Sequence, residues 1–319
     1  MSIGLIGMPR SGTTWIGKIF DSHPATLYRH EPDTGNAFKP IPFAPETKDF
    51  LHYQDLLRDF SNTLWQVRTA RVAGKRPIFP KQYDRFGTRR LRELSALLAG
   101  VASRQLRDFP VLEWTSRSAY DSSTVVWKSI ESASRLGVLT RTLPETKFIH
   151  ILRHPCGYVA SVLRGEQKQR FVNSYRASED NGMFAALANT AQARQYGLTA
   201  ETVAAFAPEE RLAWNWVLIN QKAMDDNSGQ SNYLQLKYED VCMQPIARSK
   251  EAFHYAGLSW NTQSEAFLQA SIAQDNPAYY SVFKDPMKSA TAWQRELTPE
   301  AIERVLKVLR QSTLAHLYQ

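Results

Sequence analysis

The sequence predicts an α/β protein in which a central parallel sheet is flanked by helices, and three observations lead to this prediction. Short apolar runs of strand length alternate with longer segments of helical periodicity. The alternation continues along most of the chain, without an internal repeat or a low-complexity tract. Residues suited to binding an anion directly follow several of the short runs, and ligands of parallel sheets bind at the carboxyl ends of the strands.

Five segments are predicted to be strands. The first, "SIGLIG", is a short and almost continuous apolar run, which is typical of a buried strand. Helix-like segments separate the strands, so we expect them to pair in parallel. The five segments are residues 2–7, 25–30, 124–129, 147–152 and 232–238.

Helices are predicted between and after these strands. A helix over 13–22 is expected to end at "SHP", because proline disfavours helical geometry in the residue before it. In 208–225, Leu212, Trp216 and Ile219 fall on one helical face. The last helix is expected to begin at "TPE" (298–300), since these residue types are typical of helix starts. The remaining predictions are helices over 48–72, 88–107 and 155–164, and a loop rich in proline and glycine over 31–46.

Length and charge limit the classes of function. The chain has 319 residues, a formal net charge of +8 and a pI of about 9.4. This length allows one large or two ordinary domains, and the positive charge favours acidic ligands. The cations are scattered except in 85–92, which we interpret as a solvated helix face, so no nucleic-acid partner is predicted.

Cysteine use and hydropathy predict a cytoplasmic protein. Cys156 and Cys242 lie far apart in the sequence, which favours reduced thiols and a reducing compartment. No apolar stretch is long enough to span a bilayer, and the short first apolar run leaves no room for a signal peptide. No His, Cys and carboxylate residues have metal-ligand spacing, so no metal requirement is expected.

Residues 7–15, "GMPRSGTTW", connect the first predicted strand to the first helix. Successive backbone N–H groups that end in a helix N-terminus form a concave anion site, and Gly7 and Gly12 permit a close approach. Thr13 stands where the nucleotide-phosphate loop G-x-x-x-x-G-K-[ST] has its lysine, and Arg10 offers a cation from inside the loop instead. The alternative is a strand-to-helix turn that binds nothing.

The string "PRSGTTW" resembles the 5′-phosphosulfate loop of the sulfotransferases, enzymes that use 3′-phosphoadenosine 5′-phosphosulfate (PAPS). Cytosolic members carry lysine at the position of Arg10, whereas carbohydrate and protein-tyrosine members often carry arginine. The resemblance implies a P-loop NTPase-like fold with helical insertions that cover the substrate. It also implies that the 5′-phosphosulfate is bound by Arg10, Ser11, Gly12, Thr13, Thr14 and Trp15.

The resemblance covers most of the chain in scattered blocks and implies a single sulfotransferase domain over 1–319. The nucleotide-binding core is expected over 1–31, 124–165 and 232–300, and the helical insertions on the acceptor side over 32–120 and 166–230. Oligomeric state is not indicated by the sequence.

A second anion site is predicted after "KFIHIL". Arg153 ends this strand and Ser161 lies eight residues later on the next helix, and a guanidinium with a hydroxyl is suited to a phosphate dianion. The spacing also resembles the 3′-phosphate motif of the family. The alternative for Arg153 is that it neutralises a nearby carboxylate.

Two further matches concern the adenine and the C-terminal segment. Tyr238 in "LKYED" resembles the family tyrosine that contacts adenine, with a tyrosine at the core edge as the alternative. "MKSATAW" resembles the C-terminal segment that ends at the family tryptophan, here Trp293. Where cytosolic members have an Arg-Lys-Gly triplet this chain has Pro286, Met287 and Lys288, so Lys288 is the remaining cation for the 3′-phosphate.

The catalytic residues follow from the same resemblance. Lys128 matches the strand lysine of a family Lys-Thr-His sequence and is expected at the bridging or sulfuryl oxygens, but the histidine base of that sequence is Ile130 here. Glu31, in an arrangement similar to that of carbohydrate and tyrosine sulfotransferases, is the leading candidate for the base. His30 is the alternative, and the two should point to opposite faces if the strand extends through them. A salt bridge for Glu31 and a packed His30 are the non-catalytic interpretations.

The acceptor is predicted to be a hydroxyl, or an amine, of a small molecule or a glycan. Aromatic residues of the insertions would suit an apolar acceptor, although ordinary helix packing is the better explanation for most of them, and the basic residues would suit an acidic glycan. These aromatic residues include Trp65, Phe79, Tyr83, Phe86, Trp114, Tyr120, Phe171 and Tyr175. A P-loop kinase for a small metabolite and a nucleotide-binding module without turnover are the competing hypotheses.

Overall fold

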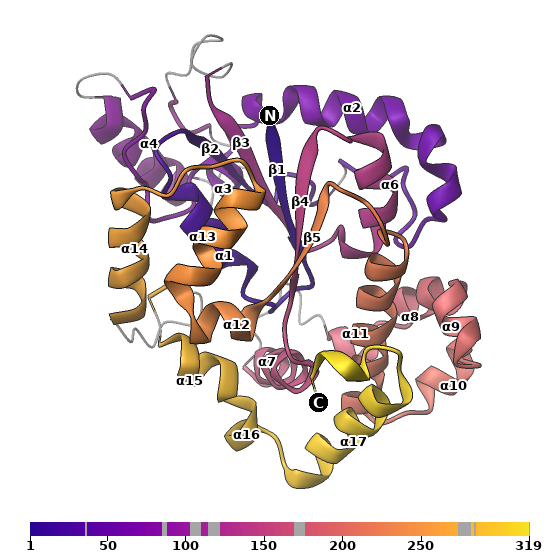
Figure 1. Ribbon diagram of the computed structural model, residues 1–319. Coiled ribbons are helices and arrows are strands. Elements are labelled where there is room, and N and C mark those ends of the chain that lie inside the picture. Colours follow the sequence, from indigo (N-terminus) through magenta and orange to yellow (C-terminus); the bar gives the residue numbers. More distant parts are fainter. Residues whose placement is uncertain are drawn as a thin grey trace.

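Five parallel strands form one central sheet in the computed structural model (Figure 1). The structure describes residues 1–35, 37–84, 88–102, 110–113, 122–168, 176–273, 282–283 and 285–318. Within these residues the strand order is β2-β3-β1-β4-β5, and every neighbouring pair is parallel. The strands are β1 (Ser2–Gly7), β2 (Thr26–His30), β3 (Thr124–Ser129), β4 (Thr146–Leu152) and β5 (Tyr233–Lys237).

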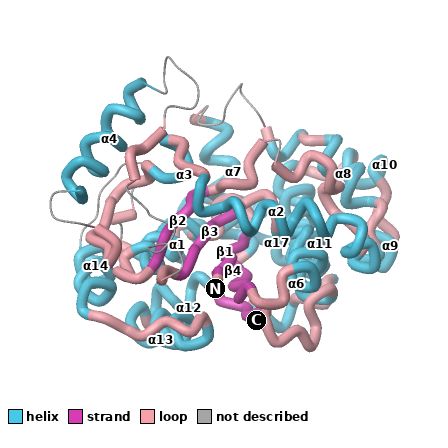
Figure 2. The backbone as a smooth tube through the Cα atoms, turned by 90° about the horizontal axis from the view of Figure 1, so that it is seen from above, coloured by secondary structure: helices cyan, strands magenta, loops and turns pink. Residues whose placement is uncertain are grey.

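Helices cover both faces of this sheet. Figures 1 and 2 show α1, α13 and α14 on one side and α6, α11 and α17 on the other. The helices of the first half of the chain are α1 (Thr13–Asp21), α2 (Gln54–Thr63), α3 (Ala70–Ala73), α4 (Thr88–Ala102), α6 (Leu136–Thr142) and α7 (Pro155–Gln167). Those of the second half are α8 (Asn181–Ala188), α9 (Ala191–Gln195), α10 (Ala200–Ala204), α11 (Pro208–Asp225), α12 (Tyr238–Met243), α13 (Pro245–Tyr255), α14 (Thr262–Ala273), α15 (Pro286–Thr291), α16 (Trp293–Glu296) and α17 (Pro299–Gln311). Short 3₁₀ helices span Thr47–Tyr53, Leu64–Gln66, Ala133–Arg135, Ala177–Glu179 and Ala315–Leu317.

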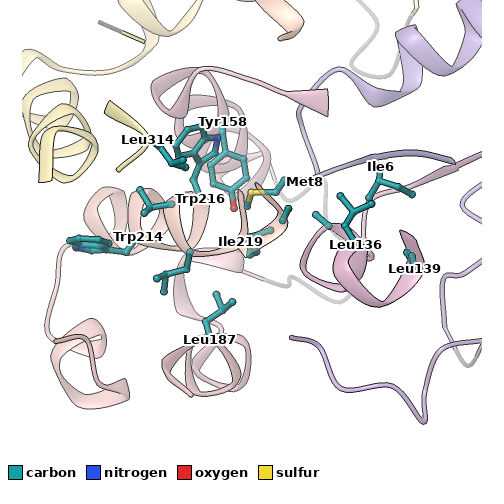
Figure 3. Packing of buried hydrophobic residues seen from close by; sticks show 14 of the residues in the cluster. Ile6, Met8, Leu136, Leu139, Tyr158, Leu187, Trp214, Trp216, Ile219 and Leu314 are labelled. Atoms are coloured by element: carbon teal, nitrogen blue, oxygen red, sulfur yellow. The ribbon is translucent and has the colours of Figure 1, made fainter. Parts of the chain in front are cut away.

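Two hydrophobic clusters flank the sheet, because successive side chains of a strand point to opposite faces. Ile3 and Leu5 of β1 belong to the cluster beneath α1 and α13, whereas Ile6 belongs to the opposite cluster. This opposite cluster, the second of the two, centres on α11, where Trp216 and Ile219 pack with side chains of α7 and of the C-terminal segment (Figure 3). The predicted apolar face of this helix is therefore confirmed, and the helix lies in the core.

The segment 48–72 is not one helix, so this prediction is wrong. It consists of a 3₁₀ helix, α2, a second 3₁₀ helix and the short α3. The Val111 N–H donates to the Arg68 carbonyl at 2.7 Å, and Thr69 forms an antiparallel bridge with Pro110. Extended backbone at 68–69 is incompatible with a continuous helix. The predicted helix over 88–107 is present as α4, and 103–107 lie outside the described residues.

Within the described part of the chain, no helix is both long enough and apolar enough to cross a membrane. Cys156 and Cys242 are both buried free thiols.

Candidate active site

A cavity of about 1270 Å³ opens at the carboxyl edge of the sheet. Its lining contains every residue that the sequence assigns to the site except Ser11, which is buried. Ser11 belongs to the segment 7–15 between β1 and α1, called the glycine loop below. The lining has more lysine and arginine than aspartate and glutamate side chains. Its cationic members are Arg10, Lys75, Lys128, Arg135, Arg153, Arg164, Lys168, Lys288 and Arg295. The cavity is therefore suited to a polyanionic ligand.

Two residues of the glycine loop have a positive φ, a backbone conformation that few residue types adopt. Gly12, immediately before α1, has a φ of +81°, and a Cβ placed there would lie 2.2 Å from Cδ2 of Tyr238. Arg10 has a φ of +72°. The helix α1 begins without a side-chain capping hydrogen bond. The missing Cβ of Gly12 leaves room for the Tyr238 ring to pack against the loop. The uncapped N-terminus of α1 lies at the cavity wall, where its backbone N–H groups are suited to an anion.

Tyr238 forms the floor of this loop. Its ring lies edge-on to Trp15, with ring centroids 6.1 Å apart, and the Arg153 guanidinium carbon is 5.1 Å from the ring centre. Burial raises the pKa of the Tyr238 hydroxyl far above its usual range, so the phenol stays neutral. Trp15 in turn donates from Nε1 to Ser271 Oγ at 3.0 Å. The predicted adenine and phosphosulfate residues are thus in contact.

The two predicted anion sites meet through Arg10, Arg153 and Ser161. Arg153 donates from Nη1 to the Arg10 carbonyl at 2.7 Å and from Nη2 to the Ser289 carbonyl of α15 at 2.7 Å. Arg10 donates from Nε to Ser161 Oγ at 2.9 Å. Within the described ranges Arg153 hydrogen-bonds no carboxylate, but its charge counteracts the rise that burial causes in the pKa of Glu239. Its role at a phosphate therefore stays a prediction, with partial neutralisation of Glu239 as the alternative.

Glu31 and Lys128 face each other at the ends of β2 and β3. The Lys128 ammonium forms an ion pair with Glu31 Oε1, and Arg71 lies 3.5 Å from Oε2. Burial lowers the pKa of Lys128, and the Glu31 carboxylate opposes this effect. The pKa of Lys75, another lining residue, is also lowered by burial, and Glu31 again opposes the shift. A carboxylate, which can accept a proton, and several cations, which can stabilise negative charge, therefore converge in this part of the cavity.

Both His30 and Glu31 line the cavity, because β2 ends at His30 and strand alternation does not extend to Glu31. Glu31 has a φ of +51°, which turns the chain out of the strand. His30 Nδ1 lies 3.0 Å from the Tyr28 hydroxyl. Burial and the Lys128 charge lower the pKa of His30 far below its usual value. A histidine in this environment is a weak base, which favours Glu31 over His30.

Lys288 lies on α15 at the cavity mouth, with a side chain that is 63% exposed and 3.8 Å from Asp285.

Sequence reasoning missed Arg164, although it lies three residues after Ser161 on a predicted helix and this spacing places both on one face. It also missed Arg71 and Lys75, for which the sequence offers no comparable signal.

The predicted acceptor aromatics do not line the cavity where they are described. Phe79 packs in the core against Phe267 at 4.8 Å between ring centroids, and Tyr83 accepts a hydrogen bond from Arg92 at 3.1 Å. Trp65 packs on the second cluster. Phe86, Trp114, Tyr120, Phe171 and Tyr175 lie outside the described residues. The apolar lining includes instead Phe43, Tyr158, Val162, Met183, Ala186 and Ile219. Among the described residues, no group of three or more His, Cys, Asp or Glu side chains could hold a metal ion.

Solved structures that resemble this fold include several sulfotransferases. The sulfotransferase domain of the olefin synthase of Synechococcus PCC 7002 aligns over 100% of this chain and 95% of its own, with 15% identity and a TM-score of 0.50. The sulfotransferase domain from the curacin biosynthetic pathway aligns over 97% and 96%, with 14% identity and a TM-score of 0.47. A mouse sulfotransferase complexed with PAP aligns over 99% and 87%, with 11% identity and a TM-score of 0.43. The first of these supports the P-loop-like α/β fold class.

A comparison with curated protein sequences finds no match. The family model described as "Sulfotransferase family" matches residues 3–262, which is most of the chain. The chain therefore belongs to the sulfotransferase family, whose reaction is the transfer of sulfuryl groups.

Proposed function

We propose that this protein transfers the sulfuryl group of PAPS to a hydroxyl or amine acceptor and releases adenosine 3′,5′-bisphosphate (PAP), with 1–319 acting as one domain. One observation carries the proposal: the glycine loop is in direct contact with the Arg153–Ser161 pair at one cavity. The contact joins Arg10 to Arg153, which are 143 residues apart in the sequence. A donor with phosphates at both ends of one ribose needs two adjacent anion sites of this kind.

The residues present fit such a donor. Gly12 lets the Tyr238 ring pack against the loop, and Arg10, Arg153 and Ser161 supply guanidinium and hydroxyl donors for phosphate oxygens. The backbone N–H groups at the start of α1, with Thr13 and Thr14, are suited to the 5′-phosphosulfate. Tyr238 offers its ring to the adenine and Lys288 a cation to the 3′-phosphate.

Transfer of this group proceeds by in-line displacement, in which positioning and charge stabilisation supply most of the catalysis. Bound PAPS supplies the activated sulfuryl group. Glu31 accepts the proton of the acceptor hydroxyl or amine as its oxygen or nitrogen bonds to sulfur. The bond from sulfur to the bridging oxygen breaks, PAP leaves with that oxygen, and Lys128 stabilises negative charge at the bridging or sulfuryl oxygens. The ion pair between the two residues holds both side chains at the cavity wall before the substrates arrive.

Calorimetry and a transfer assay test the proposal. We expect PAP to bind and ATP–Mg²⁺ to bind much more weakly, because no lysine stands at Thr13. We expect sulfuryl transfer from PAPS to at least one member of a panel of phenols, sterols, glycans and amines. Preferential binding of ATP–Mg²⁺ would favour a kinase instead, and PAP binding without transfer to any acceptor would favour a regulatory module.

A further inference from the structure

Ser161 has a second guanidinium neighbour besides Arg10. Arg164 Nη2 lies 3.4 Å from Ser161 Oγ, and Arg10 Nε lies 2.9 Å from the same oxygen. Ser161 and Arg164 are three residues apart on α7, so their side chains share one helical face. Ser161 is buried, whereas the Arg164 side chain is 30% exposed and lines the cavity.

Two guanidinium groups, those of Arg10 and Arg164, therefore flank one hydroxyl. A third, that of Arg153, donates to the Arg10 carbonyl and lines the same cavity. Guanidinium groups that lie close together repel each other, and an anion bound among them relieves the repulsion. The carboxylate that now pairs with Arg164 is Glu296 of α16, whose side chain is 32% exposed. An exposed ion pair of this kind contributes little stability, so a more highly charged anion can replace the carboxylate.

Lys288 is less well placed for the same anion. Its side chain is 63% exposed and lies 3.8 Å from Asp285, three residues away on the same short segment. Arg164 is less exposed and already within reach of Ser161. A guanidinium also binds phosphate oxygens in a fixed two-point geometry that an ammonium lacks.

We propose that Arg164 binds the 3′-phosphate of the donor together with Ser161 and Arg153, and that it exchanges Glu296 for this phosphate when the donor binds. Arg164 thereby supplies the positive charge that Pro286 and Met287 do not, and it makes the site selective for a 3′-phosphorylated nucleotide. The inference rests on the proposed function and assigns a residue that the sequence motifs leave out.

The test compares PAP with adenosine 5′-phosphate, which lacks the 3′-phosphate, by calorimetry on the full chain. Arg164→Gln, which keeps part of the side-chain stem, should weaken PAP binding about 10- to 100-fold, the value of a lost charge-assisted hydrogen bond. Its affinity for adenosine 5′-phosphate should change less than about twofold. The matched control is Arg310→Gln, which breaks an ion pair with Glu303 on α17, outside the cavity lining, and should change neither affinity.

A second variant separates phosphate binding from a structural bridge between α7 and α16. Glu296→Gln breaks the same ion pair but keeps the guanidinium, so it should leave PAP affinity unchanged or increase it. Equal losses for PAP in Arg164→Gln and Glu296→Gln would show a bridging role and overturn the inference. Equal losses for PAP and adenosine 5′-phosphate, or no loss for either, would also overturn it. A wild-type protein that fails to bind PAP would refute the proposed function itself.

Discussion

Glu31 and Lys128 connect the ends of β2 and β3 twice. The Glu31 N–H donates to the Lys128 carbonyl at 2.7 Å, and the Lys128 ammonium pairs with the Glu31 carboxylate. The Lys128 side chain is 2% exposed and that of Glu31 15%, so the carboxylate is the more accessible partner from the cavity. The backbone contact holds Glu31 at a strand end, where it lines the cavity.

Glu31→Gln should reduce turnover by about 10²- to 10⁴-fold, the usual contribution of a general base, and leave PAP affinity unchanged. Sulfuryl-transfer rates at saturating donor and calorimetry with PAP measure the two quantities. His30→Gln should retain more turnover than Glu31→Gln, because the depressed pKa of His30 makes it a poor base. Unchanged turnover in Glu31→Gln would remove this residue as the base.

Arg153→Ala should weaken PAP binding by at least about 100-fold, since more than one charge-assisted hydrogen bond is lost. Arg141 is a matched control, because it also donates to two backbone carbonyls, of Gly137 at 3.0 Å and Asp226 at 2.7 Å, but does not line the cavity. Arg141→Ala should lower the unfolding free energy and leave PAP affinity intact. Similar PAP affinities in the two variants would contradict the phosphate role of Arg153.

Gly12→Ala should destabilise the fold and abolish tight PAP binding, because the new methyl group would meet the Tyr238 ring. Gly229 has a similar φ of +77°, and nothing lies within 4 Å of the position that a Cβ would take there. Gly229→Ala therefore isolates the backbone cost, which is about 1–2 kcal/mol. Urea unfolding should show a larger loss for Gly12→Ala. Equal losses of unfolding free energy in the two variants would mean that the Tyr238 ring moves aside without destabilising the fold.

Asp21→Asn should lower the unfolding free energy by about 3–5 kcal/mol, because it leaves buried ammonium groups without their carboxylate. Asp21 lies 2.6 Å from Lys18 Nζ and 3.0 Å from Lys81 Nζ, and all three side chains are buried. Urea unfolding measures the loss. Glu251→Gln removes an exposed pair with Arg248 and should cost less than about 0.5 kcal/mol. A comparable loss in both variants would argue against the buried network.

His150 makes the protein sensitive to acid. Burial lowers the pKa of His150 to about 4, while its nitrogens lie 2.8 Å from the Tyr233 hydroxyl and 3.1 Å from Asn220 Oδ1. The unfolded chain binds this proton near pH 6.5, so stability rises with pH between about 4 and 6.5, by about 3 kcal/mol for this group. His150→Gln should flatten the dependence of unfolding free energy on pH in this window. Parallel profiles for the two proteins would rule out His150 as the cause.

The five strands were predictable because their signal is local. The expected segments 25–30, 147–152 and 232–238 correspond to β2, β4 and β5 within one residue at each end. The break in the segment 48–72 was not predictable, because residues 68–69 pair with 110–111 and such a pairing leaves no trace in the local pattern. The residues of both predicted anion sites were chosen by motif, and most of them line one cavity, since their loops follow strands that end at one edge of the sheet.

The amino-acid sequence by itself determined which residue types follow each strand, because hydrophobic periodicity and the glycine loop are encoded within a few neighbouring residues. Only the tertiary structure decided which of these residues meet. Arg10 reaches Ser161 across 151 positions, and Glu31 reaches Lys128 across 97. Such contacts depend on the strand order and on the packing of α7 against α11 and α17, and these arise from the whole set of buried side chains rather than from any single segment.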